Sequence, residues 1–262
     1  MHDAAGTPPG QPPCAPAGRL AGVPSTGRRL VLFDIDGTLI STGGRAGAAL
    51  GRALEATFGT AVPAANFRYA GKTDPQIVFE MMALVGVERG TVAPRLAAAL
   101  ECYVEALREA LAPGTVRVLP GVEALLGRLA ARTDVRLGLL TGNVAAGAAV
   151  KLGAAGLDRF FTVGAYGSDH EDRNRLVPLA RARAAAHWGE GFEDGRTVVV
   201  GDAEADIACA RAGRARAVAV ASGPTPRERL AALAPDALFD SLAEPGVLEE
   251  LVGPTVTDQA DS

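Results

Sequence analysis

From residue 116 onward the sequence alternates short apolar runs with longer amphipathic stretches, and this alternation leaves few possible folds. The apolar runs cover residues 135–140, 160–165, 197–200 and 217–221. The amphipathic stretches cover residues 120–132, 144–155, 176–188, 203–212 and 226–233. Strands that alternate with helices of this length favour a parallel sheet covered by helices on both faces. The expected fold class is therefore α/β, a doubly wound parallel sheet.

A further apolar run, residues 30–33, precedes this region and ends abruptly in Asp34 and Asp36. A continuous apolar run is typical of a strand that is buried on both faces. Because open α/β sheets bind ligands at the carboxyl ends of their strands, both carboxylates are expected at that edge. They could bind a hard cation, attack phosphorus or transfer a proton. A simple Asp-rich turn is the alternative.

The segment between this first strand and the alternating region is expected to be helical. Its apolar spacing and composition predict helices at residues 45–58, 76–85 and 92–111. Residues 44–116 are thus read as a helical insert, within a core made of residues 28–43 and 117–252. Residues 1–27, rich in Pro, Gly and Ala, are expected to be a disordered tail without the features of a targeting peptide, and residues 253–262 form a second tail.

The expected strand at residues 135–140 ends in Thr141, Gly142 and Asn143. A threonine hydroxyl, together with backbone N–H groups at the start of a helix, can hold an anionic oxygen. Taken alone, such a tripeptide is more often only a helix cap and turn. The local pattern therefore leaves both interpretations open, an anion-binding turn and a simple cap.

Two more carboxylates, Asp202 and Asp206, follow the expected strand at residues 197–200. Four residues apart at the start of a helix, they should face the same edge of the sheet as Asp34. Carboxylates so crowded repel one another unless a cation neutralises them, and oxygen-only ligands suit Mg²⁺. A capped helix with surplus acids is the alternative for this segment taken alone.

The run Asp-Ile-Asp-Gly-Thr-Leu at residues 34–39 resembles the first motif of the haloacid dehalogenase superfamily of phosphohydrolases. Thr141 matches the position of the second motif and Asp202 that of the fourth. A helical insert after the first strand is similar to the C1-type cap of the branch that resembles phosphoglycolate phosphatase and β-phosphoglucomutase. The resemblance implies a Mg²⁺-dependent phosphomonoester hydrolase acting on a small phosphorylated metabolite.

The same resemblance assigns roles to individual residues. Asp34 would be the nucleophile that forms an aspartyl-phosphate, and Asp36 would be the acid and base. Mg²⁺ would be held by Asp34, the Asp36 backbone carbonyl and Asp202, with Asp206 supporting the metal or the basic residue of the third motif. Phosphate contacts would come from Thr141, Gly142 and Asn143.

The basic residue of the family's third motif is where the sequence departs from the common pattern. The family usually places a Lys, often followed by Pro, before the helix that precedes the fourth motif, whereas residues 168–175 here read Ser-Asp-His-Glu-Asp-Arg-Asn-Arg. Arg173 is the candidate and Lys151 the alternative. Because Lys151 lies ten residues after Thr141, nearly three helical turns away, we expect it to have a packing or surface role.

Lys72 and Lys151 are the only lysines among 26 basic residues. A chain so biased towards Arg could keep Lys where a compact ammonium is needed, although chance retention is the alternative. We expect Lys72 to project from a loop at residues 69–74 over the active edge and to contact the substrate away from phosphorus.

Composition excludes some classes of function and partner. A formal net charge of −4 gives no reason to expect nucleic acid, and no apolar run reaches the length of a membrane span. Three irregularly spaced cysteines favour a reducing, cytoplasmic compartment over a disulfide framework. The expected protein is a monomer or homodimer.

Two other functions stay open on the sequence alone. A β-phosphoglucomutase-like phosphotransferase would use the same core, and a non-catalytic phosphate-binding protein would keep the fold. A dehalogenase is disfavoured because that branch lacks the second acid, which Asp36 supplies here. Intact Asp34, Asp36, Thr141 and Asp202 also disfavour the non-catalytic alternative.

Overall fold

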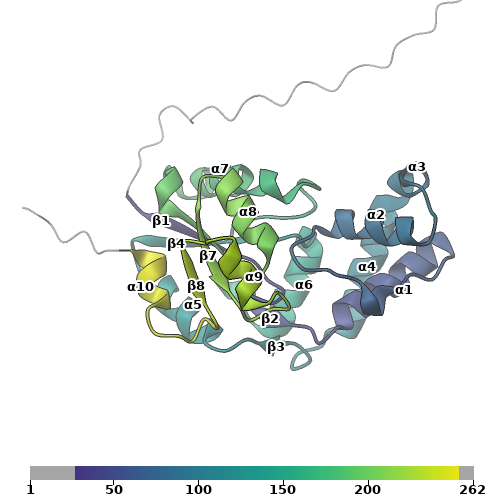
Figure 1. Ribbon diagram of the computed structural model, residues 1–262, viewed down its shortest axis with the longest axis horizontal. Coiled ribbons are helices and arrows are strands. Elements are labelled where there is room, and N and C mark those ends of the chain that lie inside the picture. The colour runs from purple at the N-terminus through teal and green to yellow at the C-terminus, as the bar shows by residue number, and fades with distance from the viewer. Residues whose placement is uncertain (1–26, 254–262) are drawn as a thin grey trace, which may run out of the picture.

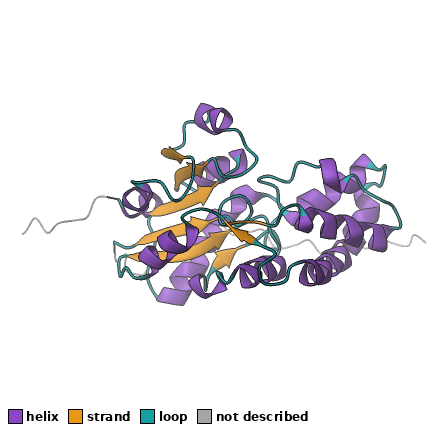
Figure 2. Ribbon diagram, turned by 90° about the horizontal axis from the view of Figure 1, so that it is seen from below, coloured by secondary structure: helices purple, strands orange, loops and turns teal. Residues whose placement is uncertain are grey.

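The computed structural model describes residues 27–253 and contains a six-stranded parallel sheet (Figures 1 and 2). The strand order is β5 (Gly164–Ala165), β4 (Val135–Leu140), β1 (Arg29–Phe33), β6 (Thr197–Gly201), β7 (Arg216–Val220) and β8 (Ala237–Phe239). Helices flank both faces, so the prediction of a doubly wound α/β sheet is confirmed. The expected tail at residues 1–27 lies, except for Gly27, outside the described residues, as does residue 254 onward.

Strand β1 lies in the middle of the sheet and sends alternate side chains into two apolar clusters. Val31 and Phe33 belong to one cluster, and Leu30 and Leu32 to the other. The first cluster includes α5 (Val122–Ala130), α6 (Ala145–Ala155) and α10 (Val247–Val252). The second includes α7 (Leu176–Trp188), α8 (Glu204–Ala212) and α9 (Arg227–Ala232). Burial on both faces explains why this strand is apolar throughout.

Four helices lie between the first two strands of the chain and the next strand, and Figure 1 shows them gathered beyond one end of the sheet. They are α1 (Arg45–Phe58), α2 (Asp74–Leu84), α3 (Arg89–Val92) and α4 (Leu96–Ala110). At their base, β2 (Ile40–Ser41) pairs antiparallel with β3 (Arg117–Val118). This short two-stranded ribbon, which the sequence patterns did not indicate, pairs the segment that leads into the insert with the segment that leads out of it.

The helical insert packs directly on the sheet domain. Met81 and Tyr103 of the insert belong to the same apolar cluster as Val31 and Phe33. Helix α4 lies close to α6, since a Cβ added to Gly147 would be 3.5 Å from Leu107 Cδ1. We propose the division expected from the sequence, with residues 44–116 as a cap on a core of residues 28–43 and 117–252.

Several element boundaries differ from the sequence-based expectation. The helix expected at residues 92–111 is divided by a 3-10 turn, Ala93–Arg95, because Pro94 fits only the first turn of a helix. The strand expected at residues 160–165 is only Gly164–Ala165, preceded by a 3-10 turn at Asp158–Phe160. Strand β8 and helix α10 were not expected. No helix within residues 27–253 combines the length and apolar character needed to cross a bilayer.

Candidate active site

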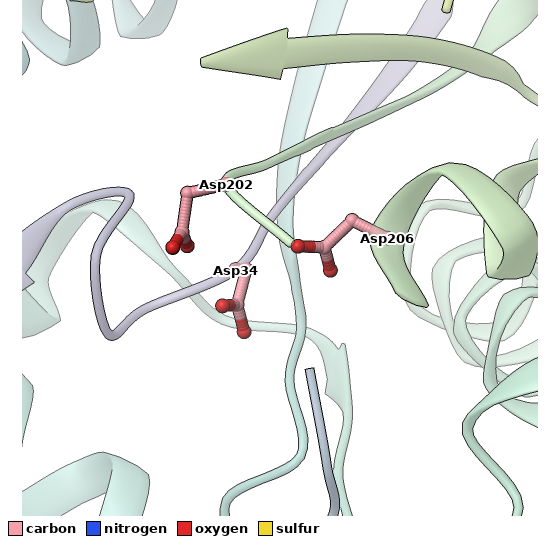
Figure 3. Close-up of side chains that lie close together, drawn as sticks. All are labelled: Asp34, Asp202 and Asp206. Carbon is pink, nitrogen blue, oxygen red and sulfur yellow. The ribbon is translucent and has the colours of Figure 1, made fainter. Parts of the chain in front are cut away.

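Three buried carboxylates converge at the carboxyl edge of the sheet (Figure 3). Asp34 follows β1, Asp202 follows β6 and Asp206 lies in the first turn of α8. Strands β1 and β6 are paired neighbours, so the residues that follow them emerge side by side. One carboxylate oxygen from each residue lies within 4.8 Å of the other two. The expectation that these acids meet at one edge therefore agrees with the geometry.

Burial and mutual repulsion make this cluster electrostatically costly. Burial, with the nearby charges of Asp34 and Asp206, raises the pKa of Asp202 well above its ordinary value. Burial also raises the pKa of Asp206 to about 7, although the charge of Arg173 opposes that rise. The Thr38 hydroxyl donates to Asp202 Oδ1 at 3.0 Å, which offsets only part of the cost.

Arg173 is the cation inside this cluster. Its Nη2 lies 3.0 Å from Asp34 Oδ1, forms an ion pair with Asp206 and donates to the carbonyl of Leu140. Burial alone would lower the pKa of Arg173, but Asp206 and Asp34 raise it overall, so the guanidinium stays charged. The Cys209 thiol donates to the Arg173 carbonyl at 3.0 Å and helps fix the backbone.

The cluster has the chemistry of a divalent cation site. Three carboxylates and one guanidinium leave a formal charge of −2 when all are ionised, and every candidate ligand atom is an oxygen. The space around Asp202 is narrow, because a Cβ on Gly37 would lie 2.4 Å from its Oδ2 and a Cβ on Gly223 only 1.7 Å away. A hard divalent cation such as Mg²⁺ fits this site in charge and ligand type.

Asp36 lies outside the carboxylate cluster and has different neighbours. Its side chain is 40 % exposed, whereas that of Asp34 is 8 % exposed. Asp36 Oδ2 accepts hydrogen bonds from Lys151 Nζ at 2.6 Å and from Asn143 Nδ2 at 2.9 Å. Two acids separated by two positions in the sequence therefore have separate cations, Arg173 for Asp34 and Lys151 for Asp36.

The turn after β4 connects the core with the insert. Asn143 Nδ2 donates to Thr141 Oγ1 at 2.8 Å as well as to Asp36, which fixes the buried threonine hydroxyl. The Gly142 carbonyl accepts the backbone N–H of Asp74 at 2.7 Å. A Cβ on Gly142 would lie 2.0 Å from the Lys72 carbonyl, so this close approach requires glycine. The structure thus brings together Asp34, Asp36, Thr141, Asn143, Arg173, Asp202 and Asp206.

Comparison with known proteins decides the family. Residues 28–214 match the model of a hydrolase family, the haloacid dehalogenase-like hydrolases. The chain belongs to the haloacid dehalogenase-like hydrolase family. It is 33 % identical over 226 residues to a phosphoglycolate phosphatase of Rhodospirillum rubrum, covering 83 % of this chain and 89 % of that protein.

Solved structures have the same fold. A predicted phosphoglycolate phosphatase from Haemophilus somnus aligns with a TM-score of 0.63 and 20 % identity, covering 86 % of this chain and 98 % of that one. A β-phosphoglucomutase candidate from Bacteroides vulgatus aligns with a TM-score of 0.65 and 15 % identity, covering 88 % and 92 %. Identities this low establish the haloacid dehalogenase-like fold alone.

The expectation that Lys151 lies far from the active edge is wrong. The side chain is buried and reaches Asp36, and it has no surface role. The helix α6 begins only at Ala145, so Lys151 is about two turns from its start rather than three from Thr141. Side chains on a helix also lean towards its amino end, which carries the ammonium back to the sheet edge.

Lys72 also differs from its expected placement. The loop at residues 69–74 does lie over the active edge, since Gly71 approaches Ala203 and Ala205 of the core. The Lys72 ammonium, however, forms an ion pair with Glu80 of α2 and lies 5.0 Å from the centre of the Phe67 ring. It lines a groove of about 430 Å³ formed by insert residues. In this conformation the backbone of Lys72, not its ammonium, is next to the active-site turn.

Sequence reasoning missed two buried polar residues of the insert, Asp74 and Tyr103. Asp74 Oδ2 accepts the backbone N–H of Val144 at 2.7 Å, and Tyr103 lies close enough to Lys151 for the two groups to interact electrostatically. Asp74 follows a capping threonine and therefore looks like an ordinary acid in the first turn of a helix. Tyr103 sits at a core position of α4, where an aromatic residue needs no functional explanation.

Proposed function

We propose that this hydrolase cleaves phosphomonoesters through a covalent phosphate on Asp34. The arrangement that carries the proposal is the Asp34 carboxylate at the end of β1, with Arg173 Nη2 at 3.0 Å and the carboxylates of Asp202 and Asp206 beside it. Such a site can bind a phosphoryl group and present a nucleophile to it at the same time.

In the first step, one oxygen of Asp34 forms a bond to phosphorus as the bond to the leaving oxygen breaks. Asp36 donates a proton to that oxygen, so the alcohol departs neutral. Arg173 and the Thr141 hydroxyl hold the phosphoryl oxygens in line. Asp34, the Asp36 backbone carbonyl and Asp202 would hold Mg²⁺, which neutralises phosphoryl charge, and Asp206 keeps Arg173 in position.

In the second step, water attacks phosphorus of the aspartyl-phosphate and releases inorganic phosphate from Asp34. Asp36, now a carboxylate, takes the proton from that water and returns to its starting state. Gly142 lets the insert approach the turn closely, and Asn143 fixes both Thr141 and Asp36. Closure of the insert would exclude bulk water during the first step.

The proposed substrate is a small phosphorylated metabolite of the phosphoglycolate kind. The relative from Rhodospirillum rubrum is named a phosphoglycolate phosphatase, and the match spans most of both chains. Phosphotransfer of the β-phosphoglucomutase kind would use the same residues and is distinguished by its product. Release of inorganic phosphate supports the hydrolase, whereas conversion of a sugar 1-phosphate to the 6-phosphate supports the mutase.

The deciding experiment combines one substitution with metal removal. Asp34→Asn keeps the shape of the side chain but removes the nucleophile, so phosphate release from small phosphomonoesters should fall to background while the fold persists by circular dichroism. Removing divalent metal should abolish wild-type activity, and adding Mg²⁺ should restore it. Clear turnover by Asp34→Asn would exclude the covalent mechanism, and activity unaffected by chelation would exclude the metal.

A further inference from the structure

Lys151 is a buried cation for which the proposed reaction has no direct use. It is 3 % exposed, and Arg173 already supplies the cation next to the nucleophile. Burying an ammonium is costly unless its protons are all hydrogen-bonded. A residue kept at that cost needs a structural or functional reason.

The Lys151 ammonium is held by protein groups of the active edge. Nζ donates to Asp36 Oδ2 at 2.6 Å and to Asn143 Oδ1 at 2.5 Å, and Tyr103 and Asp74 of the insert favour its charged form. The Lys151 side chain is only 4 % exposed, and both of these hydrogen bonds go to protein side chains. Lys151 therefore acts through its neighbours rather than on the substrate.

The effect of these bonds is to distinguish the two oxygens of Asp36. Lys151 and Asn143 both donate to Oδ2, and within residues 27–253 no hydrogen bond ends on Oδ1. A carboxylate held by one oxygen in this way cannot rotate freely, and its other oxygen is left available for proton transfer. A general acid works efficiently only when the donating oxygen is correctly placed.

The partners that hold Lys151 come from the helical insert as well as from the core. Tyr103 belongs to α4 and is 2 % exposed. Asp74 begins α2 and is 5 % exposed, and its negative charge favours the charged form of the same ammonium. The position of Lys151, and through it of Asp36, thus depends on how the insert packs against α6.

We propose that Lys151 is a positioning residue that fixes Asp36 Oδ2 so that Oδ1 transfers the proton, and that Tyr103 of the insert holds Lys151 in place. This inference rests on the proposed role of Asp36 as acid and base. It makes the insert part of the proton-transfer machinery as well as a cover for the substrate.

The consequence can be measured by changing the leaving group. An alkyl phosphate needs a proton on its departing oxygen, whereas 4-nitrophenolate leaves without one. Phosphorylation of Asp34 is the step reported by kcat/KM, because it releases the alcohol. Lys151→Met should therefore lower kcat/KM at least about tenfold more for glycerol 2-phosphate than for 4-nitrophenyl phosphate, within the range of general acid catalysis.

Tyr103→Phe and Glu190→Gln serve as the second variant and the control. Tyr103→Phe removes only the hydroxyl, so it should also lower kcat/KM more for glycerol 2-phosphate than for 4-nitrophenyl phosphate, but by a smaller factor than Lys151→Met. Glu190 is a buried acid that accepts from Arg28 and Arg136 at the amino ends of β1 and β4. Glu190→Gln should lower the melting temperature but leave the ratio of the two kcat/KM values unchanged.

The outcomes separate this inference from the proposed function. A wild-type enzyme inactive on both esters would overturn the proposed function and the inference with it. An active wild type, together with a Lys151→Met variant that loses both activities equally or neither, would overturn the inference alone. If Lys151→Met does not fold, an unchanged ratio in Tyr103→Phe overturns it.

Discussion

At the scale of single residues, the site separates two neighbouring acids by giving each its own cation. Asp34 is paired with Arg173, and Asp36 with Lys151, although the two acids are only two positions apart. An anion paired with a fixed guanidinium can approach a phosphoryl group, because the guanidinium offsets repulsion between the two negative groups. In the proposed mechanism, charge placement therefore distinguishes the nucleophile from the acid.

Arg173 provides the prediction at this scale. Arg173→Ala should lower kcat by at least about a hundredfold, as expected when a fixed charge stabiliser is lost. Arg173→Lys should recover part of that loss, because an ammonium restores the charge but not the planar fork. Steady-state kinetics with folded variants checks both. A kcat within a few-fold of wild type in Arg173→Ala would show that the guanidinium is structural.

At the scale of elements, the loop at residues 69–74 joins the insert to the active edge through its backbone. Gly71 and the Lys72 carbonyl lie against core residues, while the Lys72 ammonium is held by Glu80 on α2. An ion pair that solvent still reaches is worth little, so a substrate group could displace Glu80 from this partly buried pair. The loop is therefore suited to contact the part of the substrate remote from phosphorus.

Lys72 and Glu80 give a pair of opposite predictions. Lys72→Ala should raise KM with a smaller effect on kcat, because a contact made equally in the ground and transition states changes binding alone. Glu80→Gln should lower KM, because it frees the ammonium from its partner. Kinetics on a panel of small phosphomonoesters tests both. KM values unchanged in both variants would limit Lys72 to packing in the insert.

At the scale of the whole molecule, the burial of Asp202 beside two other acids opposes folding even though Arg173 lies in the same cluster. Burial and the neighbouring carboxylates raise the pKa of Asp202, so keeping this side chain ionised lowers the stability of the native state. A cation that binds only the folded chain offsets this cost by mass action. Metal binding and stability should consequently be linked.

Thermal unfolding tests that link without any substrate. At a Mg²⁺ concentration about a hundredfold above its dissociation constant, the melting temperature should rise by roughly 5–10 °C. Asp202→Asn should melt higher than wild type without metal and lose most of the response to Mg²⁺. Asp240→Asn, a change in an exposed acid, should keep the full response. An equal Mg²⁺ response in Asp202→Asn would place the metal elsewhere.

The sequence by itself determined the sheet and the acids at its edge. Residues 30–33 and 198–200 are apolar because their strands are buried on both faces, and the acids that follow them emerge at the same edge of any parallel sheet. The relation is local, since each acid is fixed within a few residues of its own strand. Arg173 could be proposed in the same way, because it lies in the segment that follows the strand ending at Ala165.

Only the tertiary structure decided where Lys151, Tyr103 and Asp74 act. The direction of the Lys151 side chain depends on where α6 begins and on how α4 packs against α6. Neither can be predicted from the residues around Lys151 in the sequence. Tyr103 is 48 positions from Lys151 in the sequence, and Asp74 is further away still. Contacts between elements so distant in the chain arise from how the apolar surfaces of the insert and core fit together, because the folded chain buries those surfaces jointly.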